Sequence, residues 1–526
     1  MRRDMIWLVI LACYATGGFA QTGRAAGSHL PSAVKPTVTD PTSPAGAFAG
    51  FDEWVQNTME EWHVPGVAVG AIKGGDVVLL EGYGYRDLEN ELPVTPRTLM
   101  AIGSNSKSFT VVLVGQLVDS GQLDWDKPVR DFLPRFRLHD DYATANMRVR
   151  DLVTHVSGLP RHDLLWYGRG LDRQALFDRL QYLEPTTSFR GRWQYQNLMF
   201  MTAGYLVEQI TGQSWDARIA ERIFAPLGMT RSNTSVTALP QSDDFAYPYV
   251  LRDDELRRVP FRNIDNVGPA GSINSSVEEM LAYIQFHLDS GVVGQDTILS
   301  ESNAVLMQTA QSAVGSRDQY PEIGPATYAF GLSVTTYRGH KQVSHTGGID
   351  GFISAMGWLP NDGIGVMVLS NMSGETNPVP TLVQRRVFDE LLELEPIDWN
   401  ARARQDNEER RQRQEEERQK RDAERVTGTS PSQDLAAYTG AYGHPAYGRI
   451  EVTMRDSALQ VCYDPFEVGL THYHYDVFEV EETDPGVPLA GRVQFLMAVD
   501  GKIDRLAVPL EAALDPIVFK RVKDEQ

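Results

Sequence analysis

The chain has 526 residues, of which 42% are hydrophobic and 23% are charged. This length suggests two or three domains, and the composition is that of a globular protein with a large core. The formal net charge of −21 argues against a nucleic acid or an anionic membrane as partner, because no basic surplus is available to neutralise phosphates.

Residues 1–20 have the features of a secretory signal peptide. Arg2 and Arg3 precede a short apolar segment, and the small residues Gly18 and Ala20 stand before an expected cleavage site. The apolar segment is too short to span a bilayer, and no later stretch has the length of a transmembrane helix. We therefore expect an exported protein, periplasmic or secreted, without an integral membrane segment after cleavage.

The sequence contains two cysteines, Cys13 and Cys462. Lipidation at Cys13 is an alternative to simple signal cleavage, although the residues ahead of it fit that pattern poorly. Cleavage would leave Cys462 as the one thiol of the mature chain, which excludes an internal disulfide. Because Cys462 lies in an alternating strand pattern, we expect a buried core cysteine and not a catalytic one.

A flexible leader is expected over residues 21–48, which are rich in Pro, Gly, Ala, Ser and Thr. The leader contains Ser32 and Lys35 in a Ser-x-x-Lys spacing, but prolines flank them and no helix would orient them. The spacing alone is therefore weak evidence, and its context must decide.

Regular elements begin at Phe51. The pattern predicts an amphipathic helix over 51–62, a hairpin of strands 67–72 and 77–80, mainly helices over 108–288, strands at 330–334, 342–344, 352–358 and 364–370, and a closing helix over 381–394. Strands, a helical insertion and further strands predict an α+β domain with an antiparallel sheet over residues 49–397.

Ser104 and Lys107 stand at the head of an apolar run that is predicted to form a buried helix. At spacing i, i+3 the two side chains share one helical face, so the lysine nitrogen can reach the serine hydroxyl. A serine needs a neighbouring base to become a nucleophile, and a lysine serves as that base where burial or nearby cations lower its pKa. This pair is the candidate catalytic centre.

Tyr195 and Asn197 form the second motif, in an irregular segment before a predicted helix. Side chains at i and i+2 of an extended segment point to the same side, so a phenol and an amide could face one cleft. The phenol could relay a proton and the amide could bind a substrate carbonyl. Asn197 could alternatively cap the following helix.

The third motif is His345-Thr346-Gly347-Gly348, at the end of a predicted strand. Successive glycines would let a substrate backbone lie against the strand edge. The backbone N–H groups of Gly348 and Ser104 could together form an oxyanion hole, and His345 could either contact substrate or be a structural hydrogen-bonding residue.

The last part of the chain predicts a linker and a second domain. Residues 398–430 are largely charged, with mixed signs, which favours a solvated helix that acts as a spacer. Residues 431–526 contain short strands at even spacing, separated by polar turns, and predict a small antiparallel β-barrel or sandwich.

Ser-x-x-Lys, Tyr-x-Asn and His-Thr-Gly-Gly, in this order, resemble the motifs of the serine β-lactamase and penicillin-binding-protein family. The similarity is to its class C β-lactamase, D-alanyl-D-alanine carboxypeptidase and esterase branch, and covers roughly residues 50–395. It implies that Ser104 is acylated, that Lys107 is its base or proton shuttle, that Tyr195 activates the deacylating water, and that Asn197 holds the substrate amide. The C-terminal domain resembles the accessory β-domain of such relatives.

One position departs from that family pattern, because His345 stands where many members have the lysine of Lys-Thr-Gly. A lysine is a permanent cation suited to a substrate carboxylate, whereas histidine is mostly neutral above its ordinary pKa of about 6.5. The exchange is typical of esterase and aminopeptidase-like relatives. His345, Thr346 and Gly347 are thus expected to line the substrate site without a fixed charge.

The sequence therefore predicts an exported serine hydrolase that acts on carboxylic esters or small amides and peptides, including those with a D-amino acid. A β-lactamase or D-alanyl-D-alanine carboxypeptidase is the alternative, and a silent binding protein of the same fold is the third. No cofactor is implied, and the histidines form no metal-binding signature. His155 is expected to brace a helix end, while Trp166 and Tyr167 could line a cleft or pack a loop.

Overall fold

The computed structural model describes residues 48–522 except 253–254, 316–319, 375–376 and 482–488. The predicted signal peptide, the leader, and Cys13, Ser32 and Lys35 lie outside the described residues. Two compact units are present: one contains 48–161 and 170–403, the other 162–169 and 404–522. No helix among the described residues is long and apolar enough to cross a membrane.

The first unit is built on an antiparallel sheet, which has nine strands within the described residues, in the order β10-β11-β12-β13-β14-β15-β1-β2-β3. The strands are β1 Gly66–Lys73, β2 Asp76–Asp87, β3 Leu92–Pro93, β10 Ser312–Ala313, β11 Thr327–Tyr328, β12 Ser333–Tyr337, β13 His340–Ile349, β14 Phe352–Leu359 and β15 Ile364–Ser370. Strands from both ends of the domain pair at the β1–β15 junction, which confirms the predicted α+β class.

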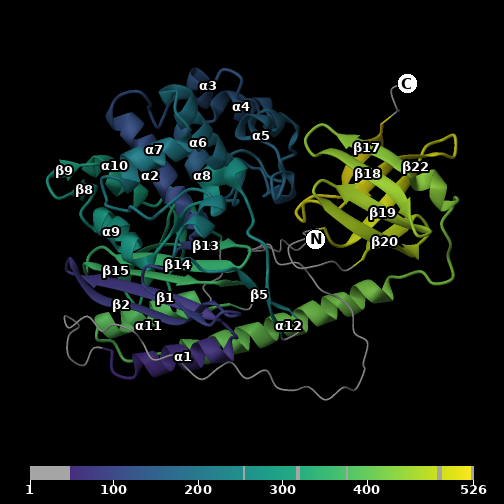
Figure 1. Cartoon of the computed structure of the whole chain (residues 1–526). Helices are drawn as coiled ribbons and strands as arrows, with labels where there is room; N and C mark the ends of the chain where they lie inside the picture. Colours follow the sequence, from purple (N-terminus) through teal and green to yellow (C-terminus); the bar gives the residue numbers. More distant parts are fainter. Residues whose placement is uncertain (1–47, 253–254, 316–319, 375–376, 482–488, 523–526) are drawn as a thin grey trace, which may run out of the picture. The chain divides into compact units, whose positions relative to one another are not determined.

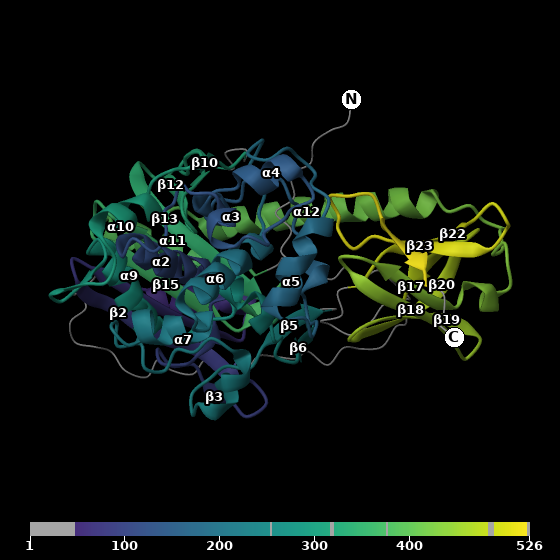
Figure 2. The same ribbon diagram turned by 90° about the horizontal axis from the view of Figure 1, so that it is seen from above.

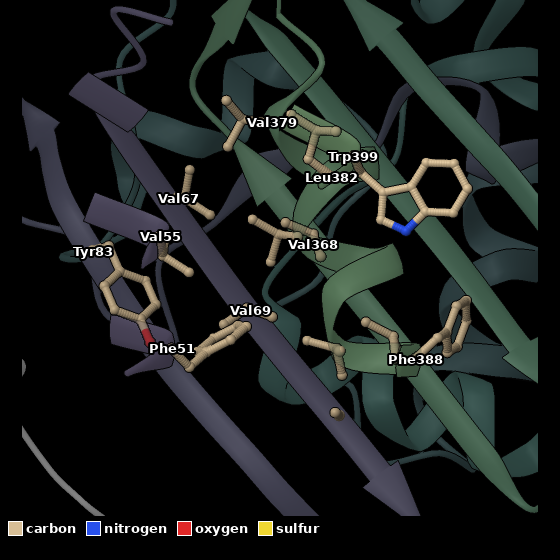
Figure 3. Packing of buried hydrophobic residues seen from close by; sticks show 14 of the residues in the cluster. Phe51, Val55, Val67, Val69, Tyr83, Val368, Val379, Leu382, Phe388 and Trp399 are labelled. Atoms are coloured by element: carbon tan, nitrogen blue, oxygen red, sulfur yellow. The ribbon is translucent and has the colours of Figure 1, made fainter. Parts of the chain in front are cut away.

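Helices cover both faces of this sheet (Figure 1). On one face, α1 Phe51–Glu61 and α11 Val379–Leu391 pack against valines of β1 and β15 in a buried core that includes Val67, Val69 and Val368 (Figure 3). On the other face, a Cβ at Gly70 would meet Leu281 of α9 Val277–Leu288, which shows how closely that helix approaches. Residues of β1 face these two layers in turn, because successive side chains of a strand point to opposite faces of the sheet.

The helical insertion surrounds α2 Ser106–Asp119, whose flanks are buried by α6 Asn197–Thr211 and α8 Gly268–Gly271. Its remaining helices are α3 Val129–Phe132, α4 Asp141–Asn146, α5 Arg173–Arg179, α7 Trp215–Ile219 and α10 Glu301–Met307. Short strand pairs join β4 Met100–Ala101 to β7 Asn274–Ser275, β5 Tyr249–Arg252 to β6 Glu255–Arg258 and β16 Met372–Ser373, and β8 Val292–Val293 to β9 Asp296–Thr297. These surrounding elements hold the buried start of α2 beside the sheet.

A buried carboxyl on β2 makes the stability of this unit depend on pH. Glu81 is 8% exposed, and its Oε2 has no hydrogen-bond partner among the described residues. It shares a face with Tyr83, whose hydroxyl donates to Asp52 of α1 at 2.8 Å. Burial, and then the neighbouring Asp52 carboxylate, raise the pKa of Glu81 to about 7.

We expect Glu81→Gln to stabilise the protein at pH 8 by roughly 1–3 kcal/mol and to change little at pH 5. The folded state holds the Glu81 proton more tightly than the unfolded chain, so this contribution is complete below pH 4.5 and is lost as the pH rises through about 7. Urea unfolding at both pH values measures the difference. Glu60→Gln, at an exposed position of α1, is the matched control and should show no such change.

The second unit contains a closed antiparallel barrel of eight strands among the described residues (Figure 2). They are β17 Gly440–His444, β18 Gly448–Arg455, β19 Ala458–Tyr463, β20 Phe466–His474, β21 Val477–Val480, β22 Arg492–Met497, β23 Ile503–Val508 and β24 Ile517–Arg521, and β17 pairs with β24 to close the barrel. Ahead of it, α12 Trp399–Ala423 is a charged helix that spans most of the predicted linker. Cys462 of β19 is half-buried, so the expected fully buried core cysteine is wrong; burial still raises its pKa.

Residues 162–169 pack within the barrel unit although they are distant from it in sequence. The Glu511 carboxylate accepts the N–H of His162 at 2.6 Å, and the Tyr447 hydroxyl lies 2.7 Å from His162 Nδ1. Tyr167 stacks on Phe466. Trp166 and Tyr167 are both buried, which favours the packing role over a substrate-lining role.

Candidate active site

The predicted nucleophile stands at the entrance to the buried helix. Ser104 lies in a short 3₁₀ turn, Gly103–Asn105, directly before α2, and its side chain is partly exposed. Asn105 holds this turn against the sheet, because its Nδ2 donates to Ser354 Oγ of β14 at 2.8 Å. The serine is therefore fixed on rigid elements and still accessible from outside.

Lys107 is fully buried and reaches back to the serine. Its Nζ lies 3.1 Å from Ser104 Oγ, 2.8 Å from Asn197 Oδ1 and 2.8 Å from the carbonyl oxygen of Ala270. Two of these neighbours are carbonyl oxygens and can only accept. A neutral amine could donate to both and direct its lone pair at the Ser104 hydroxyl, which is the arrangement that a general base requires.

Tyr195 completes the contacts of the nucleophile. Its hydroxyl donates to Ser104 Oγ at 2.8 Å, and Lys107 Nζ lies 4.8 Å from its ring centroid. Asn197 is the first residue of α6, so the predicted alternative that it caps this helix is wrong. The cap is Gln196, whose side-chain oxygen accepts the N–H of Leu198 at 2.8 Å.

The third motif lies on β13, next to the serine turn. A Cβ on Gly103 would come within 2.7 Å of Gly348 N, and a Cβ on Gly347 would come within 1.9 Å of the Ile102 carbonyl oxygen. Glycines at both positions thus allow the two backbones to touch. This approach brings the backbone nitrogen of Gly348 beside the Ser104 turn, and an oxyanion hole formed with it stays a prediction.

Gly347→Ala is expected to lower kcat/KM at least about tenfold, because the new methyl group would push β13 away from the serine turn. Overpacking of this kind also costs about 1–3 kcal/mol of folding free energy. Ester hydrolysis and thermal melting measure the two effects. Gly170→Ala, where a Cβ meets nothing within 4 Å in the described chain, should leave both unchanged.

His345 is a neutral residue in this site. It is 7% exposed, its Nδ1–H donates to the Thr346 carbonyl at 2.5 Å, and its Nε2 accepts from the Tyr328 hydroxyl at 3.2 Å. Burial and then the nearby Lys107 lower the pKa of His345 to about 3. Thr346 and Gly348 are exposed beside it. β13 therefore presents a polar and uncharged edge.

A second cationic side chain lies over the Tyr195 ring. The Arg161 guanidinium carbon is 4.9 Å from the centroid of the Tyr195 ring. The described residues contain no group of three or more His, Cys, Asp or Glu side chains that could hold a metal ion.

Several contributors to the site were missed by the sequence motifs. The Ala270 carbonyl is a backbone group, so its residue type gives no signal. Tyr328 and Gln196 were not singled out either. The ordered motifs did identify the groups that surround Ser104 Oγ.

Comparison with known proteins agrees with the fold and the motifs. A protein-family model described as Beta-lactamase matches residues 51–388, and one described as a domain of unknown function (DUF3471) matches residues 424–521. Unguisins hydrolase ungD′ of Aspergillus campestris is 30% identical over 487 residues, covering 88% of this chain and 90% of the relative. Penicillin-binding protein 4 of Amycolatopsis lactamdurans is 30% identical over 337 residues, covering 61% and 85%.

Solved structures share the architecture. The octameric penicillin-binding protein homologue from Pyrococcus abyssi has a TM-score of 0.59 at 24% identity and covers 87% of this chain and 97% of its own. The D-amino acid amidase from Ochrobactrum anthropi SV3, complexed with L-phenylalanine, has a TM-score of 0.54 at 22% identity and covers 65% and 97%. At these identities the likeness shows the fold.

Proposed function

Because this chain belongs to the beta-lactamase family and is a serine hydrolase of that fold, we propose that it cuts ester or amide bonds of small peptides, including D-amino acid derivatives, through an acyl-enzyme on Ser104. The observation that carries this proposal is the pair of contacts at Ser104 Oγ, with Lys107 Nζ at 3.1 Å and the Tyr195 hydroxyl at 2.8 Å.

In the acylation step, the Ser104 hydroxyl gives its proton to the Lys107 amine while Oγ attacks the substrate carbonyl carbon. The N–H groups of Ser104 and Gly348 stabilise the negative charge that develops on the carbonyl oxygen. The leaving amine or alcohol takes a proton from Tyr195, so the acyl-enzyme holds Tyr195 as a phenolate and Lys107 as an ammonium. Asn197 holds Lys107 and contacts the substrate amide.

In the deacylation step, water replaces the leaving group. Tyr195 takes a proton from this water as it attacks the acyl carbonyl carbon, and the bond from that carbon to Ser104 Oγ breaks. Ser104 Oγ recovers a proton from Lys107, and the free carboxylic acid departs. The two groups that transfer protons, Lys107 and Tyr195, lie within hydrogen-bond reach of the nucleophile.

Two similar proteins bear on the substrate class. The curated relative with 30% identity over most of the chain is a hydrolase of unguisins, and a structural neighbour is a D-amino acid amidase.

We also propose export, which rests on the signal-peptide features of residues 1–20. Mass spectrometry of the mature N-terminus after secretion would test it, with Gln21 as the expected first residue.

The test of the function is covalent trapping. The mature protein is treated with a fluorophosphonate and digested, and the modified peptide is sequenced by mass spectrometry; the label is expected on Ser104. In parallel, D- and L-amino acid amides and p-nitrophenyl butyrate are offered as substrates. A label on another serine, with turnover intact, would refute the proposed nucleophile.

We expect substrates that present a neutral group to β13 to be preferred over matched substrates with a free carboxylate there, by about tenfold or more in kcat/KM. His345 is neutral at working pH because its pKa is about 3, so a carboxylate in this position would be desolvated without a cation. A dipeptide amide that contains a D-amino acid and the corresponding dipeptide acid form the test pair. Equal rates would indicate that Arg161 binds the carboxylate. The Arg161→Gln variant would then test this role.

Penicillins carry a carboxylate, so the same reasoning predicts slow acylation by β-lactams. Hydrolysis of a chromogenic cephalosporin at a rate comparable with that of the best amide would instead favour the β-lactamase alternative.

A further inference from the structure

His155 is a fully buried histidine beside the active site to which the proposed mechanism gives no part. It is 0% exposed and follows the 3₁₀ turn Val149–Val153, with a left-handed backbone at φ 58°. Within the described residues, its Nε2 is buried without a hydrogen-bond partner. A buried polar atom of this kind costs free energy, so its retention calls for an explanation.

The contacts of His155 bracket Tyr195. The N–H of Gln194 donates to the His155 carbonyl at 2.8 Å, and the N–H of Gln196 donates to His155 Nδ1 at 2.9 Å. Between these two bonds, the imidazole lies against the Tyr195 ring, with centroids 4.3 Å apart and planes inclined at 32°. One residue thus fixes the backbone on both sides of the tyrosine and one face of its ring.

Other aromatic residues hold the imidazole in place. Phe200, Tyr328 and Trp193 have ring centroids 5.1, 4.6 and 5.6 Å from it. A rotation of the His155 ring would therefore disturb several neighbours at once. This packing makes the ring a rigid support and not a mobile acid or base.

The bond from Gln196 also defines the chemical state of the ring. Nδ1 accepts this bond, so the proton of the neutral ring is on Nε2. Protonating Nδ1 would break the bond and add a positive charge near Lys107 and Arg161, with His345, Tyr195 and Tyr328 as the other titratable groups facing the ring. Burial is the main reason that the pKa of His155 lies well below its ordinary value, and the electrostatic effects of Lys107, His345 and Arg161 come after it.

We propose that His155 is a positioning residue for Tyr195: its carbonyl oxygen, Nδ1 and ring hold segment 194–196 so that the Tyr195 hydroxyl points at Ser104 Oγ. The inference rests on the proposed function, since it concerns the proton-transfer role of Tyr195. A residue that only fills space would need neither the acceptor at Nδ1 nor the bracketing bonds.

Two variants of His155 distinguish the positioning role from a role that only fills space. His155→Leu keeps the bulk and removes the acceptor, and we expect kcat on an ester substrate to fall about 10- to 100-fold with little change in KM. His155→Asn can place an amide oxygen near the position of Nδ1 and tolerates a left-handed backbone, so it should recover most of the rate. His287→Leu is the matched control, because His287 is equally buried, in α9, with no partner for either ring nitrogen among the described residues.

The decisive measurement is a double-mutant cycle with Tyr195→Phe. If His155 acts through Tyr195, His155→Leu should have almost no further effect once the phenol is absent. Additive losses, or an unchanged kcat in His155→Leu, would overturn the inference. If His155→Leu does not fold, His155→Gln takes its place, because the glutamine amide reaches past the position of Nδ1. Equal rates for the Asn and Gln variants would also overturn the inference.

Failure of the proposed function gives a different pattern. In that case Tyr195→Phe alone leaves turnover intact, whichever residue stands at 155. If only the inference about His155 is wrong, Tyr195→Phe still lowers kcat, by about 10²- to 10⁴-fold.

Discussion

Ser104→Ala is expected to reduce hydrolysis of every substrate to the uncatalysed background, a loss of about 10⁴-fold or more in kcat. The reason is that Lys107 Nζ and the Tyr195 hydroxyl both lie within hydrogen-bond reach of Ser104 Oγ, so the proposed proton transfers act on this atom. Stability should change little, because the hydroxyl is partly exposed. Steady-state kinetics and thermal melting on one preparation measure both quantities.

The control for this variant is Ser120→Ala. Ser120 is exposed at the end of the same helix, where its hydroxyl donates to the Leu117 carbonyl at 3.0 Å. It should retain full activity and also take the fluorophosphonate label at Ser104. Substantial turnover by Ser104→Ala, with the label lost, would mean that hydrolysis proceeds by direct attack of water and not through an acyl-enzyme.

The fold was predictable because its signals are local. β1, β14 and β15 are short, almost continuously apolar runs, which is the pattern of strands buried on both faces, and the structure buries nearly all of their residues. The even spacing of short strands after residue 435 likewise led to the closed barrel. The start of α9 is a local feature too, because the Ser276 side chain caps the helix by accepting the N–H of Glu279.

The centre of the site was predictable because ordered motifs constrain three separate segments. Ser104, Lys107, Tyr195 and Asn197 come together through hydrogen bonds that their residue types suggested. Gln196 could not be predicted as the helix cap, because Asn is the more favoured residue there and sequence alone cannot show which side chain turns back. The packing of 162–169 within the barrel unit depends on contacts between distant residues, for which a single sequence carries no local signal.

The protonation of His345 and His155 was also beyond the sequence. Each pKa depends on burial and on the distance to Lys107, and both quantities are properties of the folded chain. The sequence identified a histidine where many relatives have lysine. The structure adds that this histidine is neutral and hydrogen-bonded to Tyr328. The prediction that uncharged substrates are preferred at β13 rests on this observation.

Lys107→Met is expected to lower kcat/KM by about 10³- to 10⁴-fold, with the fold retained. Methionine has a similar length and no basic nitrogen, so Ser104 would lose its proton acceptor. Two carbonyl oxygens, of Asn197 and Ala270, would lose a donor, which costs about 1–3 kcal/mol each. Removing the polar nitrogen from a fully buried position offsets much of that cost.

A small change in stability beside a large loss of activity would mean that Lys107 is retained for chemistry and not for folding. Lys73→Met is the matched control: Lys73 is exposed, its Nζ donates to the Leu391 carbonyl at 2.8 Å, and the same substitution there should leave kcat unchanged. Trapping with the fluorophosphonate separates the steps, because Lys107→Met should label far more slowly than the native protein. Labelling at the native rate would show that Ser104 is activated without Lys107 and would assign the base to Tyr195.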